Sequence, residues 1–398
     1  MTIAVIGGGA SGLAAAIAAS DSGAQVTVYE REKRCGRKIL ATGNGRCNMT
    51  NINAGLKNYH GIEPGFIKGV MKRFWVNETI EFFEELGIVT KVEDNGKVYP
   101  NSDQASAVLD VLRIRCETNG VNTVTGFEVS EIRKVKNRFQ IKSYNGENAW
   151  ADKVIIATGG KAAPDLGSKG AGYSILKSFG HRITELRPSL VQMRTEGNTA
   201  GKLKGIKFTG TAKMGKYEEK GEILFTDYGL SGPPIFSLSS KYENQKEIEL
   251  DLMSAYNEEE LIDMLYMRVS RNPDIALESF FVGMLNKRIG QVLLKELEIA
   301  PLSRKACTLS EKEIKACAAA IKSWKFPISG TLSWNNAQVT KGGAMTEDFN
   351  PTTMESRMTK GLYAVGEVLD IDGDCGGYNL QWAWSSGIIA GQSAAKNN

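Results

Sequence analysis

A glycine-rich turn between a strand and a helix constrains the fold of this chain most strongly. The apolar run Ile3–Ile6 leads into GGGASG at residues 7–12, which an alanine-rich run of helix formers follows. In a dinucleotide-binding turn, glycines at the spacing of Gly7, Gly9 and Gly12 permit a sharp bend, close approach of a pyrophosphate and tight helix packing. The N-terminus of the helix adds N–H groups and a positive dipole end. We therefore predict a strand–turn–helix unit that binds a dinucleotide.

A second strand and an acidic residue follow where this fold requires them. Residues 25–29 read as a strand, and Glu30 comes eighteen residues after Gly12. A carboxylate at this position can accept hydrogen bonds from both ribose hydroxyls of an adenosine. The alternative is a glycine turn that only allows the helix to pack. It does not account for the acidic residue at the end of the second strand.

Composition limits the function classes. The 398 residues suffice for two or three domains, and 42% hydrophobic with 24% charged residues is ordinary for a globular protein. A net charge of +4 without a basic block among aromatic residues argues against nucleic-acid binding. The chain enters the first strand without a leader, and the apolar stretch 3–19 is too short to span a bilayer, so we expect a cytoplasmic protein that does not bind membranes. The sequence predicts no particular oligomeric state.

Cysteines and histidines are few. Six cysteines lie without CxxC pairs, which indicates reduced thiols and argues against structural zinc. The only histidines are His60 and His181, so we expect no metal site. Neither histidine lies in a motif expected to face a cofactor. Proton transfer should therefore depend on other groups or on solvent.

A polar, glycine-rich segment follows the second strand. CGRKILATGNGRCN, residues 35–48, contains three glycines, three basic residues and two asparagines, and so polar a segment cannot form core. It is typical of a loop around an anionic ligand, with Lys38 and Arg46 supplying positive charge. Two alternatives stay open: a solvated loop, and a redox-active disulfide between Cys35 and Cys47.

Two later strands also run into glycines. Residues 154–160 read VIIATGG, and residues 361–368 read GLYAVGEV. A chain that leaves a nucleotide domain and returns at an Ala-Thr-Gly turn is typical of two-dinucleotide flavoproteins, and the Gly-Glu end of the last strand suits a flavin ribitol and phosphate. Together with the first turn, these motifs favour FAD over NAD. Residues 167–172 space their glycines similarly but follow no apolar strand, so NAD(P)H, if it is the donor, binds transiently.

Five blocks resemble a bacterial flavoprotein family that includes aminoacetone oxidase and a dehydro-bile-acid reductase. They are GRKILATGNGRCN (36–48), ATGGKAAPDLGSKGAGY (157–173), GEILFTDYGLSGPPIF (221–236), VTKGGA (339–344) and GEVLDIDGDCGGYNLQWAWSSG (366–387). The first and last are specific to this family. The resemblance implies an α/β fold, a Rossmann-like two-dinucleotide FAD domain with an inserted second domain. Many relatives carry histidine where this chain has Asp227, so no acid–base role is carried over there.

The insertion is visible in the sequence pattern after Pro188. Short strands are expected at 190–194, 206–214, 223–226, 247–252 and 326–334, which suggests a meander or barrel, and amphipathic helices at 258–269, 277–297 and 310–323. We therefore predict an FAD domain formed by 1–188 and 336–398, and a β-barrel plus helical substrate domain at 189–335. The insertion should cover the flavin.

The function predicted on this basis is that of an FAD-dependent oxidoreductase. It should transfer hydride between a non-covalently bound flavin and a small organic substrate, while the protein supplies orientation and electrostatics. The resemblance implies either an amine oxidase of the aminoacetone type or an NAD(P)H-dependent C=C reductase. The alternative is a flavin-binding module without turnover, such as a sensor or an RNA-associated flavoprotein.

The predicted site residues lie in these motifs. Those predicted to bind the cofactor are Gly7, Gly9, Ala10, Ser11, Gly12, Glu30, Arg31, Lys38, Thr42, Gly43, Asn44, Arg46, Cys47, Asn48, Val129, Thr158, Gly159, Gly160, Gly366, Glu367, Gly377, Tyr378 and Asn379. The resemblance implies that Asn48, Tyr378 and Asn379 lie near the flavin ring. The predicted catalytic residues are Lys38, Arg46, Asn48 and Tyr378; Lys38 and Arg46 would stabilise negative charge on the reduced ring.

Overall fold

The structure, a computed structural model, describes residues 1–396 and forms two compact units. Residues 1–189 and 334–396 form the first unit, and residues 190–333 form the second. Each unit has a hydrophobic core of its own. The boundaries lie next to those expected from the sequence, and each unit is described below by itself.

A five-stranded sheet forms the centre of the first unit. In spatial order its strands are β20 (Leu362–Ala364), β11 (Lys153–Ile156), β1 (Thr2–Ile6), β2 (Gln25–Glu30) and β7 (Asn122–Thr125). All neighbouring strands are parallel. Their carboxyl ends therefore share one edge of the sheet, where parallel α/β sheets bind ligands. The glycine motifs after β1, β11 and β20 and the acidic end of β2 all lie at this edge.

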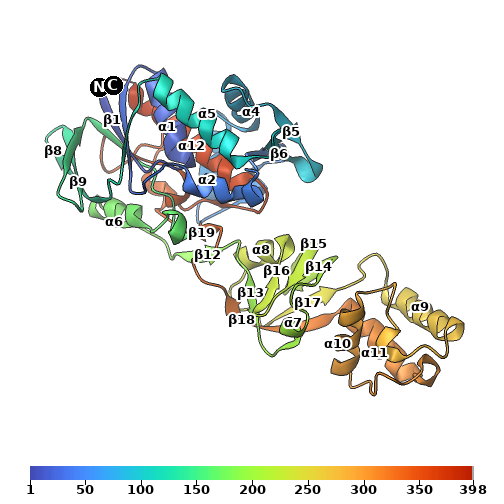
Figure 1. Ribbon diagram of the computed structural model, residues 1–398. Coiled ribbons are helices and arrows are strands. Elements are labelled where there is room, and N and C mark those ends of the chain that lie inside the picture. Colours follow the sequence, from blue (N-terminus) through green and yellow to red (C-terminus); the bar gives the residue numbers. More distant parts are fainter. Residues whose placement is uncertain (397–398) are drawn as a thin grey trace. The chain divides into compact units, whose positions relative to one another are not determined.

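Two helices pack side by side in the first unit (Figure 1). They are α1 (Ala10–Asp21) and α12 (Tyr378–Ala395). Glycines on α12 allow the close approach, because a Cβ on Gly387 would lie 2.4 Å from the Ser11 carbonyl oxygen and one on Gly391 2.3 Å from that of Ala15. The C-terminal helix thereby holds α1, and with it the glycine turn, in place.

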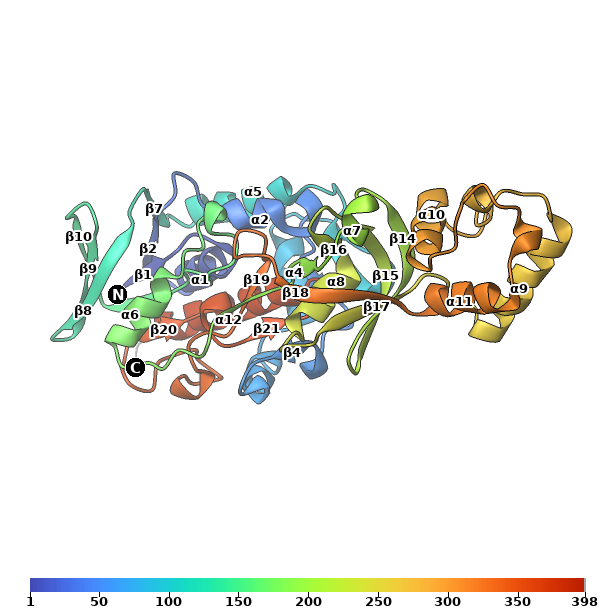
Figure 2. The ribbon, with the colours of Figure 1, turned by 90° about the horizontal axis from the view of Figure 1, so that it is seen from below.

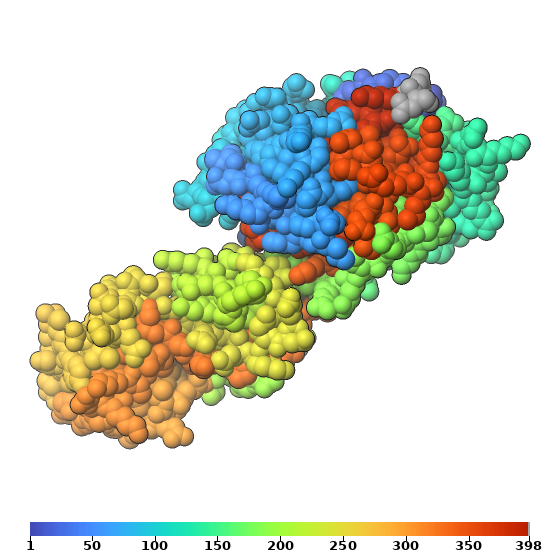
Figure 3. Space-filling model, turned by 180° about the vertical axis from the view of Figure 1, so that it is seen from behind, coloured from blue at the N-terminus to red at the C-terminus, as the bar shows by residue number. Residues whose placement is uncertain are grey.

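Shorter elements complete the first unit. The other helices are α2 (Arg37–Ala41), α3 (Ile67–Met71), α4 (Val76–Glu85), α5 (Ala105–Thr118) and α6 (Ala171–Ser178). The small antiparallel sheets are β8 (Val129–Val135), β9 (Arg138–Ser143) and β10 (Asn148–Ala151); β3 (Thr50–Asn51), β6 (Lys97–Pro100) and β5 (Thr90–Val92); β12 (Arg187–Ser189) and β19 (Val339–Lys341); and β4 (Tyr59–His60) and β21 (Asp372–Gly373). In Figure 3, the blue segment around residues 55–80 packs against the orange-red C-terminal segment.

The second unit is a closed six-stranded barrel with helices, and Figure 2 shows the helices of residues 258–322 gathered at one end of the barrel. The barrel strands are β13 (Met193–Thr195), β16 (Gly229–Ser231), β15 (Tyr217–Phe225), β14 (Lys207–Met214), β17 (Glu247–Asp251) and β18 (Trp324–Thr331). The helices are α7 (Thr199–Lys202), α8 (Pro233–Ser240), α9 (Glu258–Arg271), α10 (Lys287–Glu296) and α11 (Glu311–Lys322). The predicted Rossmann-type domain with an inserted barrel and helices is confirmed.

One predicted helix is wrong over half its length. The sequence pattern predicted a single helix over 277–297, but α10 begins only at Lys287. Gly283 adopts φ +87°, which a continuous helix cannot accommodate, and the Asn286 side chain accepts a hydrogen bond from Arg288 N as the N-cap. Apolar residues before this cap still pack into the core, which explains why they mimicked helical periodicity.

No helix within residues 1–396 is both long enough and apolar enough to cross a bilayer.

Candidate flavin site

The three glycines of the first turn are needed for different reasons. A Cβ on Gly7, which has φ +106°, would lie 2.5 Å from the Ala157 carbonyl oxygen, and one on Gly12 would lie 1.9 Å from the Gly7 carbonyl oxygen. The fold itself therefore requires these two glycines. A Cβ on Gly9 would meet no heavy atom of the described residues within 4 Å. The space beside Gly9 fits the approach of a dinucleotide pyrophosphate to the start of α1.

Glu30 is fixed beside this turn. One carboxylate oxygen accepts a hydrogen bond from Gly8 N and the other from Glu32 N, each at 2.8 Å. Burial raises the pKa of the Glu30 carboxyl, although these two bonds oppose the shift. Phe127 N donates to Glu30 O at 3.0 Å and brings the segment that contains Val129 to the end of β2. The neighbouring Arg31 forms an ion pair with Glu128 at 2.8 Å.

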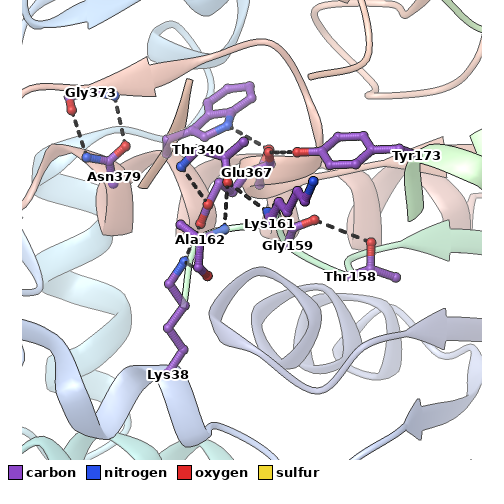
Figure 4. Close-up of polar contacts among 12 residues, drawn as sticks. Lys38, Thr158, Gly159, Lys161, Ala162, Tyr173, Thr340, Glu367, Gly373 and Asn379 are labelled. Carbon is purple, nitrogen blue, oxygen red and sulfur yellow. Dashed lines mark hydrogen bonds and ion pairs between the residues drawn. The ribbon is translucent and has the colours of Figure 1, made fainter. Parts of the chain in front are cut away.

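Lys38 and Glu367 join three motifs in one cluster (Figure 4). Lys38 Nζ donates to one Glu367 carboxylate oxygen at 2.7 Å, and Thr340 N donates to the other at 2.9 Å. The Thr340 hydroxyl accepts from Lys161 N at 2.7 Å and from Ala162 N at 2.9 Å, just after the Thr158–Gly160 turn. Glu367, which the sequence analysis predicts to bind the cofactor, thus compensates the positive charge of Lys38.

The Gly-Glu motif after β20 is held between the two long helices. Gly366 N donates to the Ser386 hydroxyl at 2.9 Å, and the Trp382 indole donates to Gly366 O at 3.0 Å. A Cβ on Gly366 would lie 2.6 Å from Ser11 Oγ, the hydroxyl that follows Ala10 at the start of α1. These contacts bring the predicted residues of the first and last motifs together.

The loop at residues 42–48 ends at Asn48, whose Oδ1 lies close to Gly377, the N-cap of α12. It bends through positive φ values at Gly43, Asn44 and Cys47, and Cys47 N donates to Thr42 O at 3.0 Å. Asn48 is 8% exposed, and its Oδ1 has no hydrogen-bond partner among the described residues. A buried amide oxygen without a donor is costly, so Asn48 fits a ligand that presents an N–H or O–H group.

The N-terminus of α12 is the second helix start at the site. Its N-cap is Gly377, at φ +98°, and no described side chain caps the helix, so its first N–H groups are available to a ligand. Asn379 accepts from Gly373 N and donates to Gly373 O, both at 2.8 Å (Figure 4). Tyr378 O accepts from the Tyr59 hydroxyl at 3.0 Å. Asn379 thus orders the loop that leads into the helix.

Arg46 lies in a separate charged cluster. Its guanidinium donates to Asp103 at 2.7 Å, forms an ion pair with Glu93, and stacks 4.0 Å above the centre of the Tyr99 ring. Arg46, Glu93 and Tyr99 line a cavity of about 420 Å³ together with Asp94, Asn95 and Lys97. Two carboxylates compensate the charge of Arg46, and its action on a reduced flavin stays a prediction.

His60 lies outside the cofactor motifs in the sequence, but the structure brings it against one of them. Its Nε2 lies 2.7 Å from Asp374 Oδ1, in the GDCGGYN segment directly before α12. The two residues are 314 positions apart, and no sequence periodicity links them. Sequence reasoning also missed Asp372, which pairs with His60 across β21 and β4.

His181 belongs to a buried structural cluster. Its Nε2 lies 3.0 Å from Ser356 Oγ, its Nδ1 lies 3.7 Å from Asp348, and its ring stacks on Phe349. The arrangement resembles a Ser-His-Asp triad, but the Ser356 hydroxyl is buried and accepts bonds from two backbone N–H groups. Burial lowers the pKa of His181. These contacts stabilise a turn and expose no nucleophile.

The remaining polar residues singled out by the sequence have ordinary surroundings. None of the six cysteines, all within residues 1–396, forms a disulfide bond. Burial raises the thiol pKa of Cys35 to about 11 and that of Cys47 to about 12, so both are protonated at neutral pH. Asp227 is exposed and forms an ion pair with Lys204 at 2.7 Å.

Comparison with known proteins identifies the chain. The family described as "HI0933-like protein Rossmann domain" matches residues 1–393. The chain belongs to the HI0933-like family. This HI0933-like protein is 38% identical to a 3-dehydro-bile acid delta(4,6)-reductase of Clostridium scindens, over 99% of both chains. It is 32% identical to a ribosomal RNA dihydrouridine synthase of Haemophilus influenzae, over 98% of both.

A solved structure supports the fold of the HI0933-like chain. The 3-ketosteroid-delta4-(5alpha)-dehydrogenase of Rhodococcus jostii RHA1 aligns with a TM-score of 0.51 at 16% identity, over 99% of this chain and 96% of that one. The family match and the 38% identical reductase mark the HI0933-like protein as an FAD-dependent oxidoreductase. The edge of the parallel sheet described above is suited to this cofactor, because it presents two uncapped helix starts, the space beside Gly9 and the unpartnered Asn48 oxygen.

Proposed function

We propose that this chain is a reductase that uses FAD to saturate a C=C bond conjugated to a carbonyl in a small organic molecule. The observation that carries the proposal is the 38% identity, over 99% of both chains, to a protein named a 3-dehydro-bile acid delta(4,6)-reductase. The name dihydrouridine synthase, carried by another relative, also denotes a saturated C=C bond next to a carbonyl. Both names favour reduction over amine oxidation of the aminoacetone type.

The residues at the sheet edge can divide the work of holding FAD. The start of α1 and the backbone at Gly9 would bind the pyrophosphate, and Glu30 would accept from ribose hydroxyls. The cluster of Lys38, Glu367 and Thr340 fixes the loops around the site. Asn48 Oδ1 and the first N–H groups of α12 would orient the flavin ring. When bound, FAD supplies the hydride chemistry.

A half-reaction assay tests the proposal. The holoprotein is reduced anaerobically with NADH, NADPH or dithionite and then mixed with a 3-oxo-Δ4 steroid, with cyclohexenone, or with the saturated ketone of each as a control. We expect an enone to restore the oxidised flavin spectrum and to gain two hydrogens by mass, while the saturated ketones do neither. Reduction of the oxidised protein by aminoacetone, without any reaction with enones, would contradict the proposal.

A second candidate substrate is uridine in RNA. It is favoured by two relatives named ribosomal RNA dihydrouridine synthase, which are 32% and 31% identical over nearly the full chain. The net charge of +4 favours the small molecule, because RNA-binding surfaces are usually strongly basic. Adding ribosomal RNA to the same assay separates the two: dihydrouridine in the RNA, with no reaction of free enones, would replace the first candidate.

A further inference from the structure

A two-stranded antiparallel pair brings His60 into register with an aspartate. In the pairing of β4 with β21, His60 lies opposite Asp372 and Tyr59 lies opposite Gly373. Opposed residues of an antiparallel pair project to the same side. No group of three His, Cys, Asp or Glu side chains within the described part of the chain is arranged to hold a metal ion. His60 and Asp372 project from the same side of this strand pair.

Asp372 is a buried carboxyl without a hydrogen-bond partner. The residue is 1% exposed, and neither carboxylate oxygen has a partner among the described residues. Burial raises the pKa of Asp372 to about 6, helped by Asp370 and Asp374 and opposed by the charges of His60 and Lys341. A carboxyl in these surroundings exchanges its proton near neutral pH.

A second aspartate, Asp374, fixes the His60 ring. The Nε2–Oδ1 distance is 2.7 Å, and the second Asp374 oxygen accepts from Asn58 Nδ2 at 3.1 Å. The bond to Asp374 raises the pKa of His60, burial opposes it, Asp372 adds to the rise and Lys341 reduces it. The His60 side chain is 34% exposed, so it can exchange protons with water. Because Nε2 binds Asp374, Nδ1 is the nitrogen left for proton transfer.

Hydrogen bonds tie this group to the start of α12. Asn379 makes two bonds to Gly373, which lies between the two aspartates, and the Tyr59 hydroxyl, next to His60, donates to Tyr378 O. Both links end at residues predicted to lie near the flavin ring. These links hold the histidine next to the two residues that we predict to lie near the flavin ring.

We propose that His60 donates the proton that completes the reduction, with Asp374 and Asp372 as positioning residues. The inference rests on the proposed function. One carbon of the C=C bond receives a hydride from the reduced cofactor, which is thereby oxidised, and the other receives the proton from the His60 imidazolium. The neutral imidazole then takes a proton from water. Reduction of the cofactor itself, by a nicotinamide or by dithionite, does not require His60.

The titration of His60 gives a test that does not depend on activity. The chain has two histidines, so ring-labelled protein should give two NMR signals, which His60→Gln and His181→Gln assign. We expect His60 to titrate above 6.5 and His181 below it, and Asp374→Asn and Asp372→Asn each to lower the pKa of His60 alone. A His60 signal that titrates at or below 6.5, or that neither substitution moves, would overturn the proposal.

The same variants in the half-reaction assay test the chemistry. In the wild type, reoxidation by an enone should be fast while His60 is protonated and slow as pH rises through its pKa. His60→Gln should bind FAD and be reduced normally, but be reoxidised about 10²–10⁴-fold more slowly and without that pH dependence. His181→Gln, the matched control, should keep the wild-type rate per bound flavin. An unchanged rate and pH profile in His60→Gln overturns this proposal alone, whereas a wild type inert to every enone overturns the proposed function and this proposal with it.

Discussion

Replacement of Gly9 with valine should yield a folded protein that no longer binds FAD. The backbone at Gly9 has φ −84°, which any residue adopts, and a side chain there would meet no described atom within 4 Å. The same side chain would stand where the pyrophosphate approaches the start of α1. Loss of two hydrogen bonds to the charged phosphates, at about 1.5–3 kcal/mol each, would weaken binding by about two to four orders of magnitude.

The measurement is the FAD affinity of flavin-free protein, alongside its circular dichroism and thermal unfolding. Gly9→Val should unfold like wild-type protein stripped of flavin, and Gly9→Ala should lose less affinity because its side chain is shorter. Stoichiometric FAD in purified Gly9→Val would mean that the turn does not approach the cofactor.

Replacement of Gly12 with alanine should damage the fold as well as the site. The added Cβ would lie 1.9 Å from the Gly7 carbonyl oxygen and 3.3 Å from the Ala157 side chain, so α1 must move away from β1. Overpacking of this kind typically costs about 1–3 kcal/mol, and a clash with backbone lies at the upper end. The urea midpoint of flavin-free Gly12→Ala should therefore fall well below that of flavin-free Gly9→Val, although alanine is the smaller residue. Equal midpoints would contradict the separate roles assigned to these glycines.

The cofactor motifs could be predicted because each is local. The turn at residues 7–12 and the acidic end of β2 lie within one β–α–β segment, and their spacing follows directly from helix and strand lengths. The later glycine motifs converge with them because parallel strands place all carboxyl ends at one edge. The barrel was predictable from short strands separated by polar turns. The helix predicted over 277–297 failed because periodicity alone does not reveal where a glycine with positive φ interrupts it.

Partners distant in the chain could not be predicted. The sequence shows that Lys38 can supply positive charge. Its pairing with Glu367, however, depends on how α2 and the loop after β20 meet. His60 meets Asp372 through strands of only two residues, which carry no periodic signal. The pairing of Arg46 with Glu93 and Asp103 likewise links a loop to a separate hairpin and its following turn. Electrostatic roles are therefore the part of the site that the sequence predicts least.

The central claim is that this sheet edge holds one FAD. Its most direct test is to denature the purified protein, after reconstitution with an equimolar mixture of FAD and FMN, and to identify the released flavin by mass and quantify it by absorbance. We predict that Gly9 and Glu30 bind the adenosine diphosphate part of the cofactor, so about one FAD per chain and no FMN should be released. Release of FMN, or of no flavin, would contradict the account.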